Sequence, residues 1–162
     1  MKLLKITFVI LLLMSFNQSH ACTLIAAGKD ATVDGSVIVS QTDNGDDSRL
    51  RVVHGKKFKK GTMVNVYWGL QEVNRPLDDH GEVLGQIPQV EQTYTYFHSA
   101  YSHINEHQLA IGESTMSQRE SVKFACRAGK QIMTIEQAMI FALQRCKTAP
   151  EALELITRLV EK

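Results

Sequence analysis

The chain has 162 residues, of which 44% are hydrophobic and 22% are charged, a composition typical of a globular protein rather than of a disordered one. The length suits a single domain, because domains commonly contain about 100–200 residues. The formal net charge is +1, so overall charge gives no reason to expect nucleic acid or an anionic membrane as a partner.

The amino terminus, residues 1–21, has the layout of a secretory signal peptide. A short basic start precedes a nearly continuous apolar run over residues 6–16, and small residues occupy the third and the first positions before Cys22. A transmembrane helix needs about 20 apolar residues, so this run is too short to span a bilayer, and no other segment is apolar enough. We therefore expect cleavage directly before Cys22 and export of residues 22–162 to the periplasm or the extracellular space.

Export would place the chain in an oxidising compartment, where cysteines tend to pair. The sequence contains three cysteines, Cys22, Cys126 and Cys146, and an odd number leaves at least one of them outside any intramolecular disulfide. Cys126 and Cys146 could form a bridge, or both could be small buried hydrophobic residues. Cys22 requires a separate explanation, because it would become the first residue of the exported protein.

The first part of the exported chain has the pattern of β-strands. An apolar run over residues 23–27 and a β-branched run over residues 36–40 flank Asp34-Gly35, which is a strong turn signal. Further strands are expected over residues 50–53, 94–97 and 107–111. The pattern is weak between residues 54 and 88, where it predicts loops with short strands.

Helical periodicity replaces the strand pattern in the C-terminal part. Apolar residues recur at helical spacing over residues 135–146 and again over residues 152–160. Each of these helices has a capping-box sequence at its start, Thr134 with Gln137 and Thr148 with Glu151. The sequence therefore predicts an α+β fold in which strands precede a pair of helices. Because the second helix runs to the last residue, we expect the chain to be an incomplete domain.

Cys22 would carry its own catalytic base once it is N-terminal. The pKa of a free α-amine is about 7.7–8.0, so part of the amine is neutral and can take the thiol proton, leaving a thiolate to attack a carbonyl. Two other interpretations compete with this one. Bacterial lipoproteins are acylated on a cysteine directly after the signal peptide, although Ser19 stands where they usually have leucine, and Cys22 could also be a core residue. Residue chemistry alone leaves a nucleophile, a lipid-anchored binding protein and a core cysteine open.

Several segments after the expected cleavage site follow one another in a distinctive order. The first begins at Cys22 and reads CTLIAAGKDATVDGSVIVS. The others are SQTDNG at residues 40–45, IPQV and TYTYF at residues 87–90 and 93–97, NEHQLAIGEST at residues 105–115, and RCKTA at residues 145–149. Together they resemble the secreted cysteine dipeptidases related to secernins, which belong to the N-terminal-nucleophile hydrolase superfamily and have bile salt hydrolases as more distant relatives.

This resemblance implies the N-terminal part of a four-layer αββα sandwich, hydrolysis of dipeptides or small peptides through a thioester acyl-enzyme, and no metal or other cofactor. It implies Cys22 as the nucleophile, with its own amine as the base, and Asp43 as the carboxylate that orients this amine. Many relatives have an arginine near the position of Gln41, and this sequence has none there. The resemblance also offers candidates for an oxyanion donor or substrate contact at the end of a strand, namely Glu113, Ser114 and Thr115, which could equally be a strand end and turn.

Two short motifs could indicate other chemistry. His103-Ile104-Asn105-Glu106-His107 matches the H-x-x-E-H pattern of inverted zinc peptidases. Zinc binding by His103 and His107 requires a helix that puts both imidazoles on one face, but the flanking sequence is strand-like, so a turn is the preferred interpretation. The basic run over residues 56–60 could bind a polyanion, but no other basic cluster extends it, and a solvated loop is preferred.

Overall fold

The computed structural model of the protein describes residues 22–42, 49–68, 82–99, 101, 103–114, 119, 121 and 132–161. The strands in chain order are β1 (Thr23–Ala27), β2 (Ile38–Thr42), β3 (Arg51–Val53), β4 (Met63–Trp68), β5 (Glu82–Pro88), β6 (Tyr96–His98) and β7 (Ile104–Asn105). The helices are the short 3₁₀ turn η1 (Lys29–Ala31), α2 (Ile135–Arg145) and α3 (Ala149–Val160). Antiparallel strands followed by a helix pair are consistent with the predicted α+β class.

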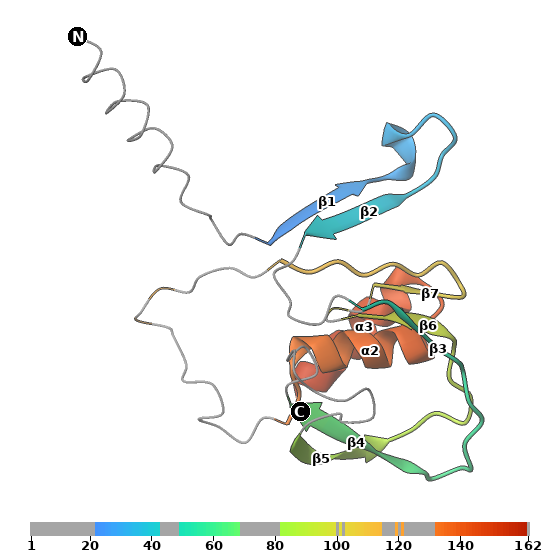
Figure 1. Ribbon diagram of the computed structural model, residues 1–162, viewed down its shortest axis with the longest axis vertical. Coiled ribbons are helices and arrows are strands. Elements are labelled where there is room, and N and C mark those ends of the chain that lie inside the picture. The colour runs from blue at the N-terminus through green and yellow to red at the C-terminus, as the bar shows by residue number, and fades with distance from the viewer. Residues whose placement is uncertain are drawn as a thin grey trace, which may run out of the picture.

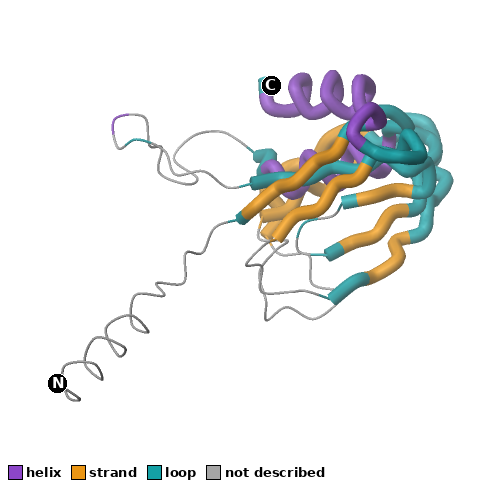
Figure 2. The backbone as a smooth tube through the Cα atoms, turned by 90° about the horizontal axis from the view of Figure 1, so that it is seen from above, coloured by secondary structure: helices purple, strands orange, loops and turns teal. Residues whose placement is uncertain are grey.

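The described strands form three small antiparallel sheets, with the orders β1-β2, β3-β6-β7 and β4-β5. The β1–β2 and β4–β5 hairpins lie at opposite ends of the described part of the molecule, with the three-stranded sheet and the helices between them (Figure 1). Seen from above, α3 lies at one side of the strands (Figure 2). None of the helices in the described part is long and apolar enough to cross a membrane.

The β1–β2 hairpin forms at the predicted turn. Asp34 and Gly35 occupy it, and the φ angle of Gly35 is 72°, a conformation that glycine adopts without a Cβ clash. The Ser36 N–H donates to Asp34 Oδ1 over 3.0 Å, which closes the turn locally. The hairpin leaves large apolar side chains exposed, including Ile25 at 66% and Ile38 at 56%.

Helix α2 is the most deeply buried element among the described residues. Its position between the β4–β5 hairpin and the three-stranded sheet explains why its buried residues extend around the helix rather than along one stripe (Figure 1). Hydrogen bonds connect it to the chain on either side: the Tyr67 N–H donates to Gln137 Oε1 over 3.0 Å, and the Tyr94 N–H donates to the Gln144 carbonyl over 2.9 Å. The core cluster around it consists of Tyr96, Leu109, Ile140, Ala142, Leu143, Cys146 and Ala152.

Both helices begin where the capping sequences predict. At α2, the Gln137 N–H donates to Thr134 Oγ1 over 3.4 Å, but the Gln137 side chain bonds to β4 instead of returning to the cap. At α3, the Glu151 carboxylate accepts the backbone N–H groups of Lys147 and Thr148 over 2.7 and 3.2 Å. These bonds hold the pKa of Glu151 below its ordinary value, because they favour the charged carboxylate.

The described residues within 54–88 form longer strands than the short ones predicted among loops there. Strands β4 and β5 pair from Met63↔Pro88 to Trp68↔Glu82, and the register shifts between Val66 and Tyr67. A Cβ at Gly85 would lie 2.9 Å from the end of the Ile132 side chain, so this glycine lets two distant segments pack closely without a shift of that side chain. The glycine that weakens the strand pattern in the sequence is therefore a packing residue.

The predicted strand over residues 107–111 is wrong. The chain instead forms β7 earlier, turns at residues 106–107, and makes only an isolated bridge between Ala110 and Ile104. The φ angle of Gln108 is 63°, a left-handed conformation that interrupts an extended strand. The cause is the side chain of Asn105, which bonds to the backbone that a strand ladder would otherwise use.

Asn105 is a buried polar residue whose amide is hydrogen-bonded on both sides. Its Nδ2 donates to the carbonyls of Leu143 and Cys146 over 2.9 and 2.8 Å. Its Oδ1 accepts the N–H groups of His107 and Leu109 over 3.0 and 3.1 Å. The side chain therefore joins the turn after β7 to the C-terminal end of α2, where helix carbonyls lack partners within the helix.

We predict that Asn105→Ala lowers the free energy of unfolding by about 2–4 kcal/mol, because it leaves buried N–H and C=O groups without partners. Urea denaturation followed by circular dichroism measures this change. Asn65→Ala is the control, since the half-buried Asn65 amide bonds, among the described residues, to the side chains of Tyr67 and Gln86, and we expect it to cost about 1 kcal/mol. Equal losses in the two variants would contradict the importance assigned to Asn105.

Candidate active site

Cys22 lies immediately before β1 and is half-buried. Strand β2 holds the start of β1 in place: Thr23 is the register partner of Thr42, and the Thr23 N–H also donates to Thr42 Oγ1 over 3.1 Å. Asp43, the carboxylate expected to orient the Cys22 amine, follows Thr42 in the sequence and lies outside the described residues.

A distant segment, residues 112–114, lies against the β1–β2 hairpin. Gly112 comes so close that a Cβ there would collide with the Leu24 side chain and crowd the Val39 side chain. Only glycine permits this approach without displacing a side chain of the hairpin. The close contact places the next two residues, Glu113 and Ser114, beside the start of β1.

Hydrogen bonds connect this segment to the hairpin and to Cys22. The Glu113 N–H donates to Gln41 Oε1 over 2.8 Å, and the Ser114 hydroxyl donates to the Cys22 carbonyl over 2.9 Å. Ser114 and Cys22 are 92 positions apart in the sequence. The structure thus brings together Cys22, Glu113 and Ser114, while Thr115 lies outside the described residues.

The donors of this segment are directed at the protein itself. The Glu113 N–H is used by Gln41, and the Ser114 hydroxyl hydrogen by the Cys22 carbonyl. In this arrangement both groups suit the positioning of Cys22 better than the binding of an oxyanion, which needs donors directed at the reacting carbonyl.

Gln41 and Thr42 are site residues that sequence reasoning did not identify. Gln41 was notable in the sequence only as the position where relatives have an arginine, yet its side-chain amide holds the Glu113 backbone. Their position at the end of β2 could have identified them. The antiparallel hairpin predicted around Asp34-Gly35 brings the end of β2 beside the start of β1, where Cys22 lies.

The two histidines of the H-x-x-E-H motif do not share a helix face. His103 precedes β7 and His107 lies in the following turn. Their rings contact different aromatic side chains: His103 stacks on Phe97 with a centroid separation of 6.4 Å, and His107 meets Tyr94 edge-on at 4.3 Å. The segment therefore lacks the helical geometry that the zinc interpretation requires.

Cys146 is a core residue, one of the two possibilities expected from the sequence. It is 5% exposed and forms no disulfide with any residue in the described ranges. Its proposed bridging partner, Cys126, lies outside those ranges. Burial raises the pKa of the Cys146 thiol, mainly because the thiolate would lose its hydration, and the nearby Glu151 carboxylate adds to the effect.

A protein-family model described as Peptidase family C69 matches residues 21–162. The comparisons with curated proteins and with solved structures found no similar protein. The matched range begins one residue before Cys22 and includes every residue placed in the site above.

We predict that Cys22 is alkylated much faster than Cys146 in the native protein near neutral pH. The thiolate is the reactive form, so a raised pKa lowers its population at Cys146 and burial also blocks the reagent, whereas Cys22 is half-buried. Peptide mass spectrometry after iodoacetamide pulses measures both rates, and Cys146 labelling should accelerate as pH rises. In urea the two rates should converge. Native Cys146 labelling as fast as that of Cys22 would contradict this assignment.

Proposed function

The chain belongs to peptidase family C69, and we propose that it hydrolyses dipeptides with Cys22 as the nucleophile. Membership implies peptide-bond hydrolysis, and the dipeptide substrate and the residue roles are our proposal. The observation that carries it is the hydrogen bond from Ser114 to the Cys22 carbonyl. This bond joins residues 92 positions apart and fixes the backbone of Cys22, as a site that must position its nucleophile requires.

The proposed reaction begins after removal of residues 1–21, which gives Cys22 a free α-amine. The amine takes the thiol proton, and the thiolate attacks the peptide carbonyl to form a tetrahedral intermediate. As the C–N bond breaks, the protonated amine returns its proton to the leaving amino group and a thioester remains on Cys22. The amine then takes a proton from water, whose oxygen attacks the thioester, and the released thiolate recovers a proton.

The described contacts support this mechanism through the backbone around the amine. Ser114 binds the Cys22 carbonyl, and Thr42 binds the N–H of the next residue, Thr23. With both ends of this peptide unit held, the amine and the thiol have fewer orientations to search, and such pre-organisation favours reaction. We assign Asp43 the role of orienting the amine, because it directly follows Thr42, the register partner of Thr23.

We also propose that the described sheets are the N-terminal part of a four-layer αββα sandwich and that the protein is exported. The exposed apolar side chains of the β1–β2 hairpin support the first proposal, since a facing sheet would bury residues such as Ile25 and Ile38. The signal-peptide pattern before Cys22 supports the second.

We predict that Cys22→Ala, made in the full protein that carries this sequence, lowers kcat for dipeptide hydrolysis by at least about a thousandfold, as removal of a catalytic nucleophile does elsewhere. Release of amino acids from a dipeptide panel measures it. Cys146→Ala is the matched control, because it deletes the same thiol from the core and should retain most activity. Activity of Cys22→Ala comparable with that control would refute the assignment. Loss of wild-type activity on chelation, with recovery on zinc, would instead support His103 and His107.

A second prediction separates positioning from general stability. Ser114→Ala should reduce kcat by about tenfold with little change in KM, because one hydrogen bond that orients Cys22 is lost while substrate contacts remain. Ser99→Ala is the control: its hydroxyl also donates to a backbone carbonyl, over 2.8 Å, but to that of Tyr101 and not to that of Cys22. Ser114→Thr, which keeps the hydroxyl, should restore part of the rate. Equal kinetics for Ser114→Ala and Ser99→Ala would show that Ser114 does not position the nucleophile.

A further inference from the structure

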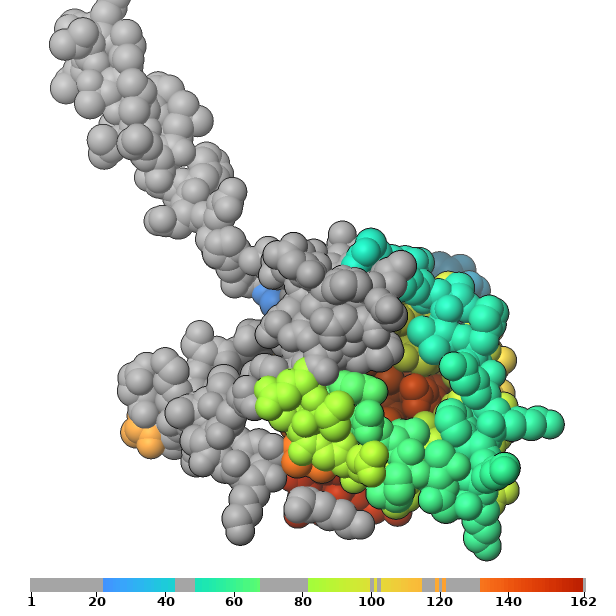
Figure 3. Space-filling view, turned by 60° about the horizontal axis from the view of Figure 1, so that its bottom comes forward, coloured from blue at the N-terminus to red at the C-terminus, as the bar shows by residue number. Residues whose placement is uncertain are grey.

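A pocket of about 500 Å³ lies between the β4–β5 hairpin, the three-stranded sheet and α2. Figure 3 shows a hollow bordered by the chain over residues 49–68, with orange-red atoms of the helical region at its floor. Its volume is in the range of small-molecule sites, which span about 300–1,000 Å³. Cys22, Glu113 and Ser114 do not line it, and the β1–β2 hairpin lies at the other end of the molecule (Figure 1). The pocket is therefore separate from the candidate active site.

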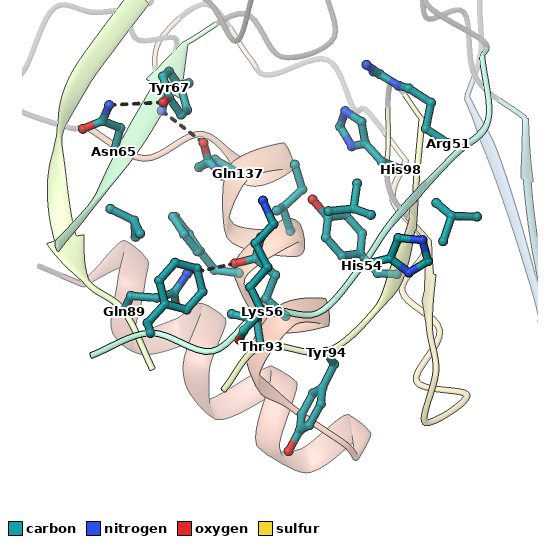
Figure 4. A pocket seen from close by; sticks show the side chains of 18 residues that line it. Arg51, His54, Lys56, Asn65, Tyr67, Gln89, Thr93, Tyr94, His98 and Gln137 are labelled. Atoms are coloured by element: carbon teal, nitrogen blue, oxygen red, sulfur yellow. Dashed lines mark hydrogen bonds between the residues drawn. The ribbon is translucent and has the colours of Figure 1, made fainter. Parts of the chain in front are cut away.

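Four basic side chains line the pocket, and no acidic side chain of the described residues does. Arg51, His54, Lys56 and His98 line it, and none of the described residues in its wall is an aspartate or a glutamate. Arg51 and His98 are cross-strand partners on β3 and β6, and their side chains lie side by side at one edge of the pocket (Figure 4). An anion entering the pocket would thus meet favourable charges without an opposing carboxylate in the described wall.

Lys56 is held in place by its backbone. The Lys56 N–H donates to Thr93 Oγ1 over 2.9 Å, and the Thr93 N–H donates to the Lys56 carbonyl over 2.9 Å. The preceding Gly55 lies so close to the Thr93 carbonyl that a Cβ would overlap it. This glycine therefore permits the close pairing that presents the Lys56 ammonium toward the middle of the pocket (Figure 4).

The basic run over residues 56–60 is solvent-exposed at its lysines, but its side chains do not all face the same way. In extended backbone, alternate side chains point to opposite sides, and Lys56 and Phe58 line the pocket while Lys57, Lys59 and Lys60 do not. All four lysines of the run are exposed, as predicted, and Lys56 is the one that also lines the pocket. Lys56 alone contributes its charge to the cavity.

The rest of the lining combines apolar surface with amide groups of fixed orientation. Phe58, Ile140 and Phe141 contribute apolar surface. Asn65 Nδ2 donates to the Tyr67 hydroxyl over 3.1 Å, and Gln137 Oε1 accepts the Tyr67 N–H over 3.0 Å (Figure 4). These bonds restrict the rotation of both amides, so a ligand would not have to order them.

We propose that this pocket binds a small organic carboxylate with an aromatic or alkyl body and no cationic group. The carboxylate would accept hydrogen bonds from Lys56 at the cationic side, and the apolar body would pack against Phe58 and Phe141. An ammonium group on the ligand would face positive charge with no carboxylate in the described wall to receive it. An inorganic anion would leave the apolar wall uncovered.

Isothermal titration calorimetry with the full chain tests this with four probes, none of which contains a peptide bond. We expect hydrocinnamate to bind more tightly than hydrocinnamyl alcohol, which lacks the negative charge, and than L-phenylalanine, which differs from hydrocinnamate by its ammonium group. Inorganic phosphate should bind weakly and should not displace hydrocinnamate.

The matched variants are Lys56→Gln and Lys60→Gln, which remove the same charge from neighbouring positions. Lys56→Gln should raise the Kd for hydrocinnamate about tenfold, through loss of a charge-assisted hydrogen bond, and Lys60→Gln should leave it within about twofold. Circular dichroism checks that both variants fold. The proposal is overturned if both variants weaken binding equally, if L-phenylalanine or phosphate binds as tightly as hydrocinnamate, or if hydrocinnamate does not bind to the wild-type protein.

Discussion

The hydrogen bonds of the buried Asn105 side chain are the interaction on which the rest of the described structure depends. They join the turn after β7 to the end of α2, and therefore join the three-stranded sheet to the helix pair. The backbone beyond the turn follows from them, because the Asn105 N–H donates to the Leu109 carbonyl and the Ile111 N–H to the His103 carbonyl. That path leads directly to Gly112 and the contacts with Cys22. A polar side chain in the core thus sets the geometry of a site at the molecule's edge.

The three-stranded sheet and the helix pair lie between two regions with different chemistry. At one end, the β1–β2 hairpin presents Cys22, and the candidate catalytic groups are a thiol and, after cleavage, an amine. Toward the other end, β3, β6 and α2 border a pocket rich in cationic and amide groups. The three-stranded sheet lies between the β1–β2 hairpin and α2, so the two regions are on different elements (Figure 1). Arg145 at its end shows the cost of such burial: desolvation lowers the pKa of this guanidinium to about 10, while Gln89 and the Phe141 ring contact it.

Sequence reasoning succeeded where the signal is local and failed where packing decides. The Asp34-Gly35 turn and the helix starts at Thr134 and Thr148 depend on residues within a few positions of one another, so their patterns are readable. The β4–β5 hairpin was expected only as short strands among loops, because Gly85 is unfavourable in a strand by propensity and is accommodated here by packing against Ile132. The strand expected over residues 107–111 was wrong because the Asn105 side chain accepts backbone N–H groups that would otherwise bond to a neighbouring strand.

By itself, the sequence determined the α+β order of elements, the helix caps, the position of Cys22 directly after a signal-peptide pattern, and a resemblance that the match to peptidase family C69 supports. These features depend on composition, residue spacing and the order of segments, all of which are present in the sequence before the chain folds. Only the tertiary structure decided that Ser114 meets Cys22, that Gln41 holds Glu113, and that Lys56, alone in its basic run, faces a pocket. Such contacts join residues 37 to 92 positions apart. They arise from the packing of sheets and helices against one another. A glycine that admits close approach, or a buried amide that needs hydrogen-bond partners, determines which distant segments come into contact.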